Sequence, residues 1–184
     1  MCRINEILSI GVGNIFRLIL YYGFLKHLPS SYSMFGGHIW RKWRFYCCRG
    51  LFKKCGKNVN IEHGAVFGSG RNIEIGDNSG IGIDAVIPGD TIIGSNVMMG
   101  PNCYIFSTNH AFDRLDIPMI LQGKTERKIT VIEDDVWIGR NVTFTPGRTV
   151  KKGSIIGAEC LLCKDFPEYS IIGGNPSKLI RSRT

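Results

Sequence analysis

Residues 75–105 read IGDNSGIGIDAVIPGDTIIGSNVMMGPNCYI, and a bulky apolar residue recurs in this stretch at every sixth position. The members of the series are Ile75, Ile81, Ile87, Ile93, Met99 and Ile105. The same phase resumes after a break, at Ile132, Ile138, Phe144, Val150, Ile156 and Leu162. Neither an α-helix, with a period of 3.6, nor a simple hairpin strand, with a period of 2, produces a strict period of six. Internal repetition therefore determines the architecture.

Most hexapeptides also have a small or β-branched residue four places after the bulky one. Examples are Ser79, Ala85, Thr91, Val97, Cys103, Val136, Val142, Ser154 and Cys160. Glycine often follows the bulky residue directly, as at Gly76, Gly82, Gly94, Gly100, Gly139 and Gly157. This period predicts an all-β solenoid, in which parallel coils form a prism and each face is one short strand and a turn. The bulky residues are expected in the axis, and the glycines at corners that require a positive φ.

The repeat divides the chain into three regions. Residues 58–167 are predicted to form the solenoid, with a two-residue slip around 69–72 and an inserted loop at 106–131. Residues 1–57 are expected to be a basic, apolar helical segment and linker, and residues 168–184 a C-terminal tail. Long irregular loops inside compact domains are usually functional, so the inserted loop is the first place to look for a site.

Charge is unevenly distributed along the 184 residues, which suit one domain and carry a net charge of +8. Residues 1–57 contain ten Lys or Arg and a single acid, Glu6, whereas the repeats are near neutral. This pattern indicates a local anionic partner, and no aromatic and basic platform indicates nucleic-acid binding. The seven scattered cysteines favour a reducing, cytoplasmic setting. Cys160 and Cys163 spell C-x-x-C but are interpreted as repeat residues, not as a redox pair.

A helix is predicted over residues 5–28, from apolar residues at helical spacing. Polar residues interrupt it, so it is not read as a membrane-spanning helix. Two interpretations stay open. The helix caps the end of the solenoid, with Trp40 and Trp43 buried beneath it. Alternatively, it is a peripheral anchor on the inner face of the cytoplasmic membrane, helped by the basic run at 41–57.

The inserted loop opens with the sequence STNHAFD at residues 107–113. His110 is the only histidine at the edge of the insertion, and an imidazole is a natural general base at neutral pH. Asn109, or a carboxylate of Asp113 or Asp116, is expected to fix its tautomer by hydrogen bonding. A solvated loop histidine with no catalytic role is the alternative from spacing alone.

No metal site is predicted. A zinc hydratase needs three converging histidines, whereas only His63 and His110 lie in the repeats. Cys47, Cys48 and Cys55 lack the paired spacing of a zinc site.

Several motifs together resemble the left-handed β-helix acetyltransferases of the hexapeptide-repeat family. They are His110 in its loop, VWIGRN at 136–141, Gly157-Ala158, Lys164-Asp165 and GNPSKLIR at 174–181. The similarity covers roughly residues 55–184 and is greatest to the sugar and polysaccharide O-acetyltransferases near the maltose and galactoside enzymes. The resemblance implies a left-handed parallel β-helix.

The resemblance also implies a homotrimer that binds acetyl-CoA in the groove between neighbouring chains, with His110 as the catalytic base and no metal. It assigns coenzyme A contacts to Trp137, Arg140, Ala158, Cys163, Lys164, Lys178 and Arg181. Asn109 and Asp113 are expected on the acceptor side. Lysine and arginine suit one end of this slot because coenzyme A is a polyanion.

The predicted activity is direct acetyl transfer to a sugar hydroxyl in capsule or O-antigen biosynthesis. The acceptor is a sugar or a lipid-linked oligosaccharide. Alternatives that share the fold are an N-acetyltransferase of an amino sugar or nucleotide sugar, a streptogramin-type antibiotic acetyltransferase, and a non-catalytic scaffold.

Five positions depart from the family pattern, and two of them are Lys151 and Lys152, which stand in a turn where the family has glycine. Gly80 and Pro88 stand where the maltose-type enzymes have polar acceptor contacts, which puts a maltose-type acceptor in doubt. Arg148 occupies a packing place, and it is expected to point outward or to distort a corner because burying its charge in the axis is costly.

Overall fold

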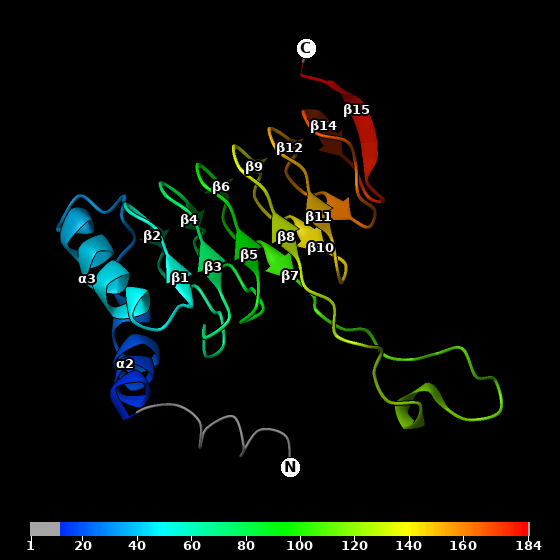
Figure 1. Ribbon diagram of the computed structural model, residues 1–184, viewed down its shortest axis with the longest axis horizontal. Helices are drawn as coiled ribbons and strands as arrows, with labels where there is room; N and C mark the ends of the chain where they lie inside the picture. The colour runs from blue at the N-terminus through cyan, green and yellow to red at the C-terminus, as the bar shows by residue number, and fades with distance from the viewer. Residues whose placement is uncertain (1–11, 184) are drawn as a thin grey trace.

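The computed structural model describes residues 12–183 and shows a prism of stacked coils with two helices at its N-terminal end (Figure 1). The helical elements of this cap are α2 (Val12–Gly23), η1 (Leu25–His27) and α3 (Gly37–Arg49). The part of the predicted helix before residue 12 lies outside the described residues. Helix α3 falls in the stretch that was expected to be a linker.

Three parallel faces make up the prism. The first holds β1 (Lys54–Cys55), β3 (Glu74–Ile75), β5 (Ile92–Ile93), β8 (Val131–Ile132) and β11 (Thr149–Val150). The second holds β2 (Asn60–Ile61), β4 (Gly80–Ile81), β6 (Met98–Met99), β9 (Trp137–Ile138), β12 (Ile155–Ile156) and β14 (Ser170–Gly173), with β15 (Lys178–Ser182) antiparallel to β14. The third holds β7 (Tyr104–Ile105), β10 (Thr143–Phe144) and β13 (Leu161–Leu162), preceded by bridges at Val66 and Val86.

The predicted axis residues form the core. In the two-residue strands the first residue faces outward and the second faces the core, as in β3, where Glu74 is half-buried and Ile75 is fully buried. Within the described residues, only β1 and β6 of these strands have a second residue, Cys55 and Met99, that is partly buried. Apart from Met99, which is partly buried, every member of the period-six series is buried. The small residues four places later are buried as well. The predicted solenoid with an N-terminal helical segment is therefore confirmed.

The register reproduces the repeat. Glu74 pairs with Ile92, three hexapeptides later, whereas Lys54 pairs with Glu74 across two more residues. The predicted slip around residues 69–72 accounts for this difference. The solenoid also extends beyond the predicted bounds: β1 starts it at Lys54, and β14 adds a strand inside the predicted tail because Ile172 continues the buried row of Ile156.

The prediction for the corner glycines is wrong. Positive φ occurs two residues later, at Asn78 (56°), Asp84 (53°) and Asn96 (59°), whereas the glycines that follow the bulky residues have ordinary φ. They are required by close stacking of the coils, because a Cβ on Gly100 would lie 2.7 Å from the backbone nitrogen of Arg140. Asn and Asp take the left-handed positions because they tolerate this conformation better than other non-glycine residues.

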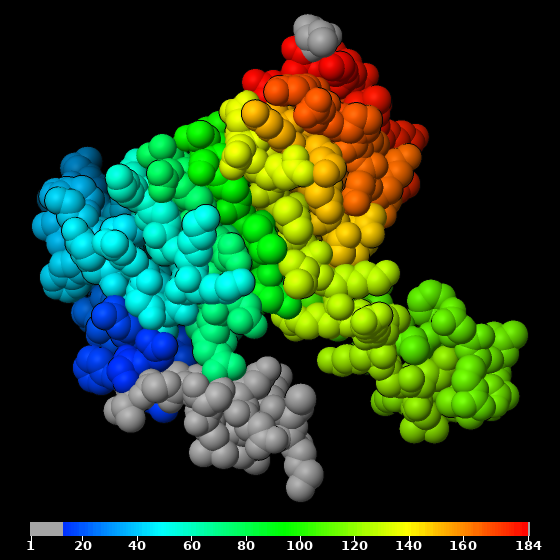
Figure 2. All heavy atoms as spheres, in the orientation of Figure 1, coloured from blue at the N-terminus to red at the C-terminus, as the bar shows by residue number. Residues whose placement is uncertain are grey.

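Residues 106–131, hereafter the arm, leave the prism after β7 and return at β8, and they project away from the coils (Figures 1 and 2). The arm contains only one short helix, η2 (Met119–Leu121). Its tip exposes large apolar side chains, including Leu115 at 99% and Ile120 at 84%. Monomeric proteins rarely expose such groups together, so the tip is a candidate contact surface.

The N-terminal cap packs on the first coils. Tyr21 of α2 is buried, and its hydroxyl donates to the Ala65 carbonyl at 2.9 Å. The expectation that Trp40 and Trp43 are buried beneath a helix is wrong. Trp40 is only half-buried and Trp43 is 48% exposed, because Trp43 lines an open groove between α2 and α3. Within residues 12–183, no helix combines the length and the apolar character needed to cross a bilayer.

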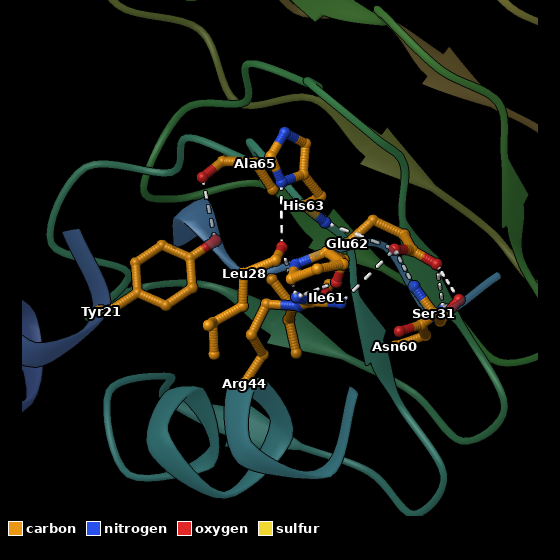
Figure 3. A network of polar contacts seen from close by, with 10 residues as sticks. Tyr21, Leu28, Ser31, Arg44, Asn60, Ile61, Glu62, His63 and Ala65 are labelled. Atoms are coloured by element: carbon orange, nitrogen blue, oxygen red, sulfur yellow. Dashed lines mark hydrogen bonds and ion pairs between the residues drawn. The ribbon is translucent and has the colours of Figure 1, made fainter. Parts of the chain in front are cut away.

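A buried ion pair fastens α3 to the first coil (Figure 3). Arg44 is fully buried, and its guanidinium donates to the Ile61 carbonyl at 2.6 Å and the Pro29 carbonyl at 2.9 Å. Its Nη2 atom lies 3.6 Å from the Glu62 carboxylate, which is an ion pair too long for a hydrogen bond. The carboxylate accepts hydrogen bonds from the Ser31 backbone N–H and hydroxyl and from the Asn60 side chain.

Candidate active site

The turns that follow the strands of the third face form one edge of the prism, which we call the arm edge. It comprises residues 67–72, 87–90, 106–108, 145–148 and 163–165. Backbone hydrogen bonds stack these turns, for example from the Asn72 N–H to the Gly89 carbonyl at 3.1 Å and from the Phe106 N–H to the Phe144 carbonyl at 3.0 Å. The arm begins at the middle of this edge.

His110 lies at the base of the arm, where the two limbs pair. His110 and Lys124 form an antiparallel bridge, and the Thr125 N–H donates to the Asn109 carbonyl at 2.8 Å. The Lys128 N–H donates to the Ser107 carbonyl at 2.9 Å. These bonds fix the backbone that carries the imidazole, which is exposed.

The predicted hydrogen bond that would fix the tautomer of the His110 ring is not formed among the described residues. Asp116 instead forms an ion pair with Arg114, and no hydrogen bond among the described residues reaches the ring. Asn109 and Asp113 are exposed. An exposed imidazole at a branch point is available to a ligand.

A cavity of about 950 Å³ opens on the N-terminal half of the arm edge, and its lining reaches Thr108, two residues before His110. Ser107 and Thr108, which precede His110, line one end of it. Helix α2 contributes Leu18 and Tyr22 to the wall. The remaining lining comes from turns of the first three coils and from the returning limb of the arm, and includes Arg71, Asn72, Pro88, Asp90, Tyr104, Phe106 and Arg127.

An ion pair closes the polar side of this cavity. The Arg127 guanidinium donates from Nε to Asp90 at 2.5 Å and from Nη2 to the same carboxylate at 2.7 Å. Two parallel bonds of this kind fix the relative orientation of both groups. The pair therefore holds the returning limb of the arm against the second coil.

The predicted coenzyme A residues fall into two groups. Cys163 and Lys164 follow β13 and lie at the C-terminal end of the arm edge, on the same edge as the branch point of His110. The others belong to the second face and the turns that follow it. Trp137 of β9 is 52% exposed, in a row that continues through Ile155 and Ile171 to Arg181 of β15.

Arg140 and Ala158 stack in the turns between the second and third faces, where the Glu159 N–H donates to the Arg140 carbonyl at 3.0 Å. Lys178 begins β15 opposite Gly173. Lys164, Arg140, Lys178 and Arg181 are all exposed, as cations that meet a phosphate must be. Within one chain the structure therefore places Cys163 and Lys164 on the arm edge, and the other predicted residues on the second face and the turns that follow it.

Arg148 points out of the axis, as predicted, and braces the C-terminal end of the arm edge. Its guanidinium donates to the Cys163 carbonyl at 3.2 Å and lies 3.4 Å from the Asp165 carboxylate. A hydrogen bond with Ser177 lowers the pKa of the Cys163 thiol, whereas burial raises the pKa of Cys160 to about 11. The buried Cys160 is thus a packing residue, which agrees with the interpretation of the C-x-x-C pair.

Sequence reasoning missed the cavity residues. Arg71 and Asn72 lie in the two-residue slip, and Arg127 lies in the arm, where the period is lost. The slip itself was the available signal, because extra residues at one corner open space beside the neighbouring coil. Within residues 12–183, no cluster of three or more His, Cys, Asp or Glu side chains forms a metal site.

Comparison with known proteins identifies the class. A family profile described as "Bacterial transferase hexapeptide (six repeats)" matches residues 72–107. A putative acetyltransferase of Saccharomyces cerevisiae is 36% identical over 138 residues, which cover 74% of this chain and 69% of that protein. The galactoside O-acetyltransferase of Escherichia coli is 32% identical over 133 residues, which cover 71% of this chain and 64% of that protein.

A solved structure of galactoside acetyltransferase in complex with coenzyme A matches with a TM-score of 0.72 and 25% identity, covering 96% of this chain and 85% of that chain. The repeat, the fold and these relatives together define a solenoid transferase. The chain belongs to the hexapeptide-repeat acetyltransferase family. The predicted class of enzyme, an acetyl-CoA-dependent acyltransferase, is therefore confirmed.

Proposed function

We propose that the protein transfers an acetyl group from acetyl-CoA to a hydroxyl of a sugar, with His110 as the general base. The observation that carries this proposal is the order of features along the arm edge. The cavity occupies its N-terminal half, His110 branches off in the middle, and Lys164 lies at the C-terminal end. An acceptor and a thioester on this edge would meet at the imidazole.

The reaction needs one proton acceptor and one site for developing negative charge. Acetyl-CoA supplies the acetyl group. The His110 imidazole takes the proton of the acceptor hydroxyl as the new C–O bond forms, and it returns that proton to the sulfur as the C–S bond breaks. A backbone N–H of a neighbouring coil is suited to hold the carbonyl oxygen when it becomes negative. No acyl-enzyme is required.

The acceptor is proposed to belong to surface-polysaccharide synthesis, as a free sugar or a lipid-linked oligosaccharide. Labelled acetyl-CoA offered with galactosides, maltose, amino sugars, streptogramin and lipid-linked oligosaccharides tests this. Transfer to a hydroxyl supports the proposal. Transfer only to an amino group or to the antibiotic supports the alternatives, and a protein that neither binds coenzyme A nor transfers an acetyl group supports a scaffold.

We further propose a homotrimer, in which each site is shared between neighbouring chains. The two groups of predicted coenzyme A residues lie on different parts of the prism, and parallel packing of copies would bring one part against the other. Apolar side chains support such packing: Met98 and Trp137 are 61% and 52% exposed on the second face, and Leu115 projects from the arm. A neighbouring chain would also supply a group to orient His110.

Sedimentation should therefore give about three times the chain mass of 20.5 kDa. Ile120→Glu, which places a charge on the exposed apolar tip of the arm, is expected to weaken the assembly and the activity together. An exposed control on the cap, His38→Ala, should change neither. A stable, active monomer would contradict the shared site.

The donor site is predicted to hold the 3′-phosphate of coenzyme A with lysine and arginine. Lys164→Ala and Arg181→Ala should each weaken binding of acetyl-CoA more than binding of dephospho-CoA, because only the first ligand carries that phosphate. Calorimetric titration of both ligands measures the difference. Equal losses for the two ligands would place these side chains elsewhere in the slot.

The cap is also proposed to contact the inner face of the cytoplasmic membrane. Its groove between α2 and α3 exposes Phe16 at 67%, Phe24 at 51% and Tyr46 at 62%, although these helices fold against the coils. Arg17 lines the groove, and α3 carries the exposed Lys42 and Arg49. A basic side chain adds about 1 kcal/mol of attraction when it lies near anionic lipid. The structure of residues 12–57 is thus compatible with a cap that also docks.

Flotation with vesicles tests the membrane contact. The full-length chain should float with anionic vesicles at low salt and less at high salt, and Phe16→Glu should reduce flotation under both conditions. A chain that never floats with anionic vesicles leaves the cap as a purely structural element.

A further inference from the structure

The cavity on the arm edge has two chemically different sides. Tyr104 and Phe106 form one side, with ring centroids 4.6 Å apart and an interplanar angle of 45°. Both rings remain exposed, at 42% and 43%. The paired Asp90 and Arg127 side chains lie among the other lining residues, together with the polar Asn72.

The exposure of the two rings is unusual for their positions. Tyr104 occupies the outward place of the third face, where Val86, Thr143 and Leu161 of the other coils are all half-buried. Phe106 immediately follows the strand, at the start of the arm. Neither ring is needed for the core, whose axis residue in this coil is the buried Ile105. Two adjacent aromatic rings that face a cavity are therefore available to a ligand.

We infer that Tyr104 and Phe106 form the platform on which the acceptor's sugar ring stacks, and that they select acceptors with an exposed apolar ring face. A pyranose has C–H groups on its faces and hydroxyls around its rim, so one face suits aromatic rings while the rim suits polar groups. Ser107, Thr108 and Asn109 connect Phe106 to His110. The platform therefore lies close along the chain to the residue that carries the imidazole.

This inference rests on the proposed sugar acetylation and adds specificity residues to it. Tyr104→Ala and Phe106→Ala are each expected to raise KM for the best soluble pyranoside of the wild-type panel by about 3- to 10-fold, the range of an aromatic contact. The double variant should multiply the two effects. Affinity for coenzyme A should stay unchanged, because neither ring belongs to the proposed donor site.

Conservative variants separate stacking from folding. Phe106→Tyr should keep KM close to wild type, and Tyr32→Ala, which removes an 83% exposed ring outside the cavity, should do the same. Saturation-transfer NMR should give its strongest signals on the C–H protons of the bound pyranoside, and these signals should fall in Phe106→Ala. Thermal unfolding checks that each variant is folded.

The outcomes distinguish this inference from the proposed function. Sugar acetylation with unchanged KM in both alanine variants overturns the platform and leaves the proposed function intact. A wild-type protein that binds coenzyme A but acetylates no sugar overturns the proposed function, and the platform with it. If Phe106→Tyr raises KM as much as Phe106→Ala does, the site requires the exact shape of phenylalanine, and stacking on an aromatic ring does not explain the effect.

Discussion

His110→Ala is expected to lower kcat by about 10²–10⁴-fold, the usual contribution of a positioned general base. The imidazole sits at the branch point between the cavity and the C-terminal end of the arm edge. In the proposed mechanism, the acceptor hydroxyl then has no proton acceptor as it attacks. Affinity for coenzyme A should remain nearly unchanged, because the base acts on the acceptor. Steady-state kinetics and calorimetric titration measure the two quantities.

His38→Ala provides a matched control, since His38 is an exposed imidazole on α3, away from the arm edge. His110→Gln tests whether hydrogen bonding alone is enough, because glutamine can position a hydroxyl but cannot take its proton at neutral pH. Wild-type turnover in His110→Ala would refute the assignment. A loss of coenzyme A binding equal to the loss of kcat would instead make His110 a structural residue.

The sequence was sufficient to predict the prism because its core is built from one hexapeptide pattern that recurs along the chain. A bulky residue such as Ile75 and a small residue such as Ser79 recur at fixed spacing, and parallel stacking converts that spacing into an axis. The repeat also predicted the position of the arm, because the six-residue period is interrupted where the chain leaves the coils. The predicted conformation of the glycines that follow the bulky residues was wrong. Composition alone does not separate a positive φ from a close approach, and the contact at Gly100 depends on the neighbouring coil.

The site was less predictable than the fold. The motifs indicated the residue types for a donor site, but the division of Trp137 and Lys164 between the second face and the arm edge follows from the three-dimensional winding of the coils. The cavity also depends on α2, whose Tyr22 donates to the Gly68 carbonyl at 2.9 Å and lines the cavity wall. No periodic signal connects a terminal helix to a particular coil, so the contribution of α2 to the cavity wall could not be predicted from the sequence.

Breaking the buried ion pair of Arg44 and Glu62 is expected to cause a large loss of folding stability. Arg44→Met should lower the free energy of unfolding by about 3–5 kcal/mol, because it leaves a carboxylate buried without its cation. The backbone carbonyls of Ile61 and Pro29 also lose their donor. Chemical denaturation followed by circular dichroism measures the change. Lys53→Met is the matched control: it breaks an exposed ion pair with Glu74 and should leave stability nearly unchanged.

The same pair predicts how stability depends on pH. Burial raises the pKa of Glu62, but hydrogen bonds from Ser31, Asn60 and the His63 N–H together lower it below its usual value. A carboxyl whose pKa is depressed in the folded state stabilises the fold above its unfolded pKa of about 4.3. That contribution is lost as the pH falls through the lower, folded value. Glu62→Gln should therefore unfold with a smaller acid dependence than wild type. An unchanged acid profile in Glu62→Gln, together with a stable Arg44→Met, would show that apolar packing by residues such as Tyr21 holds the cap without the ion pair.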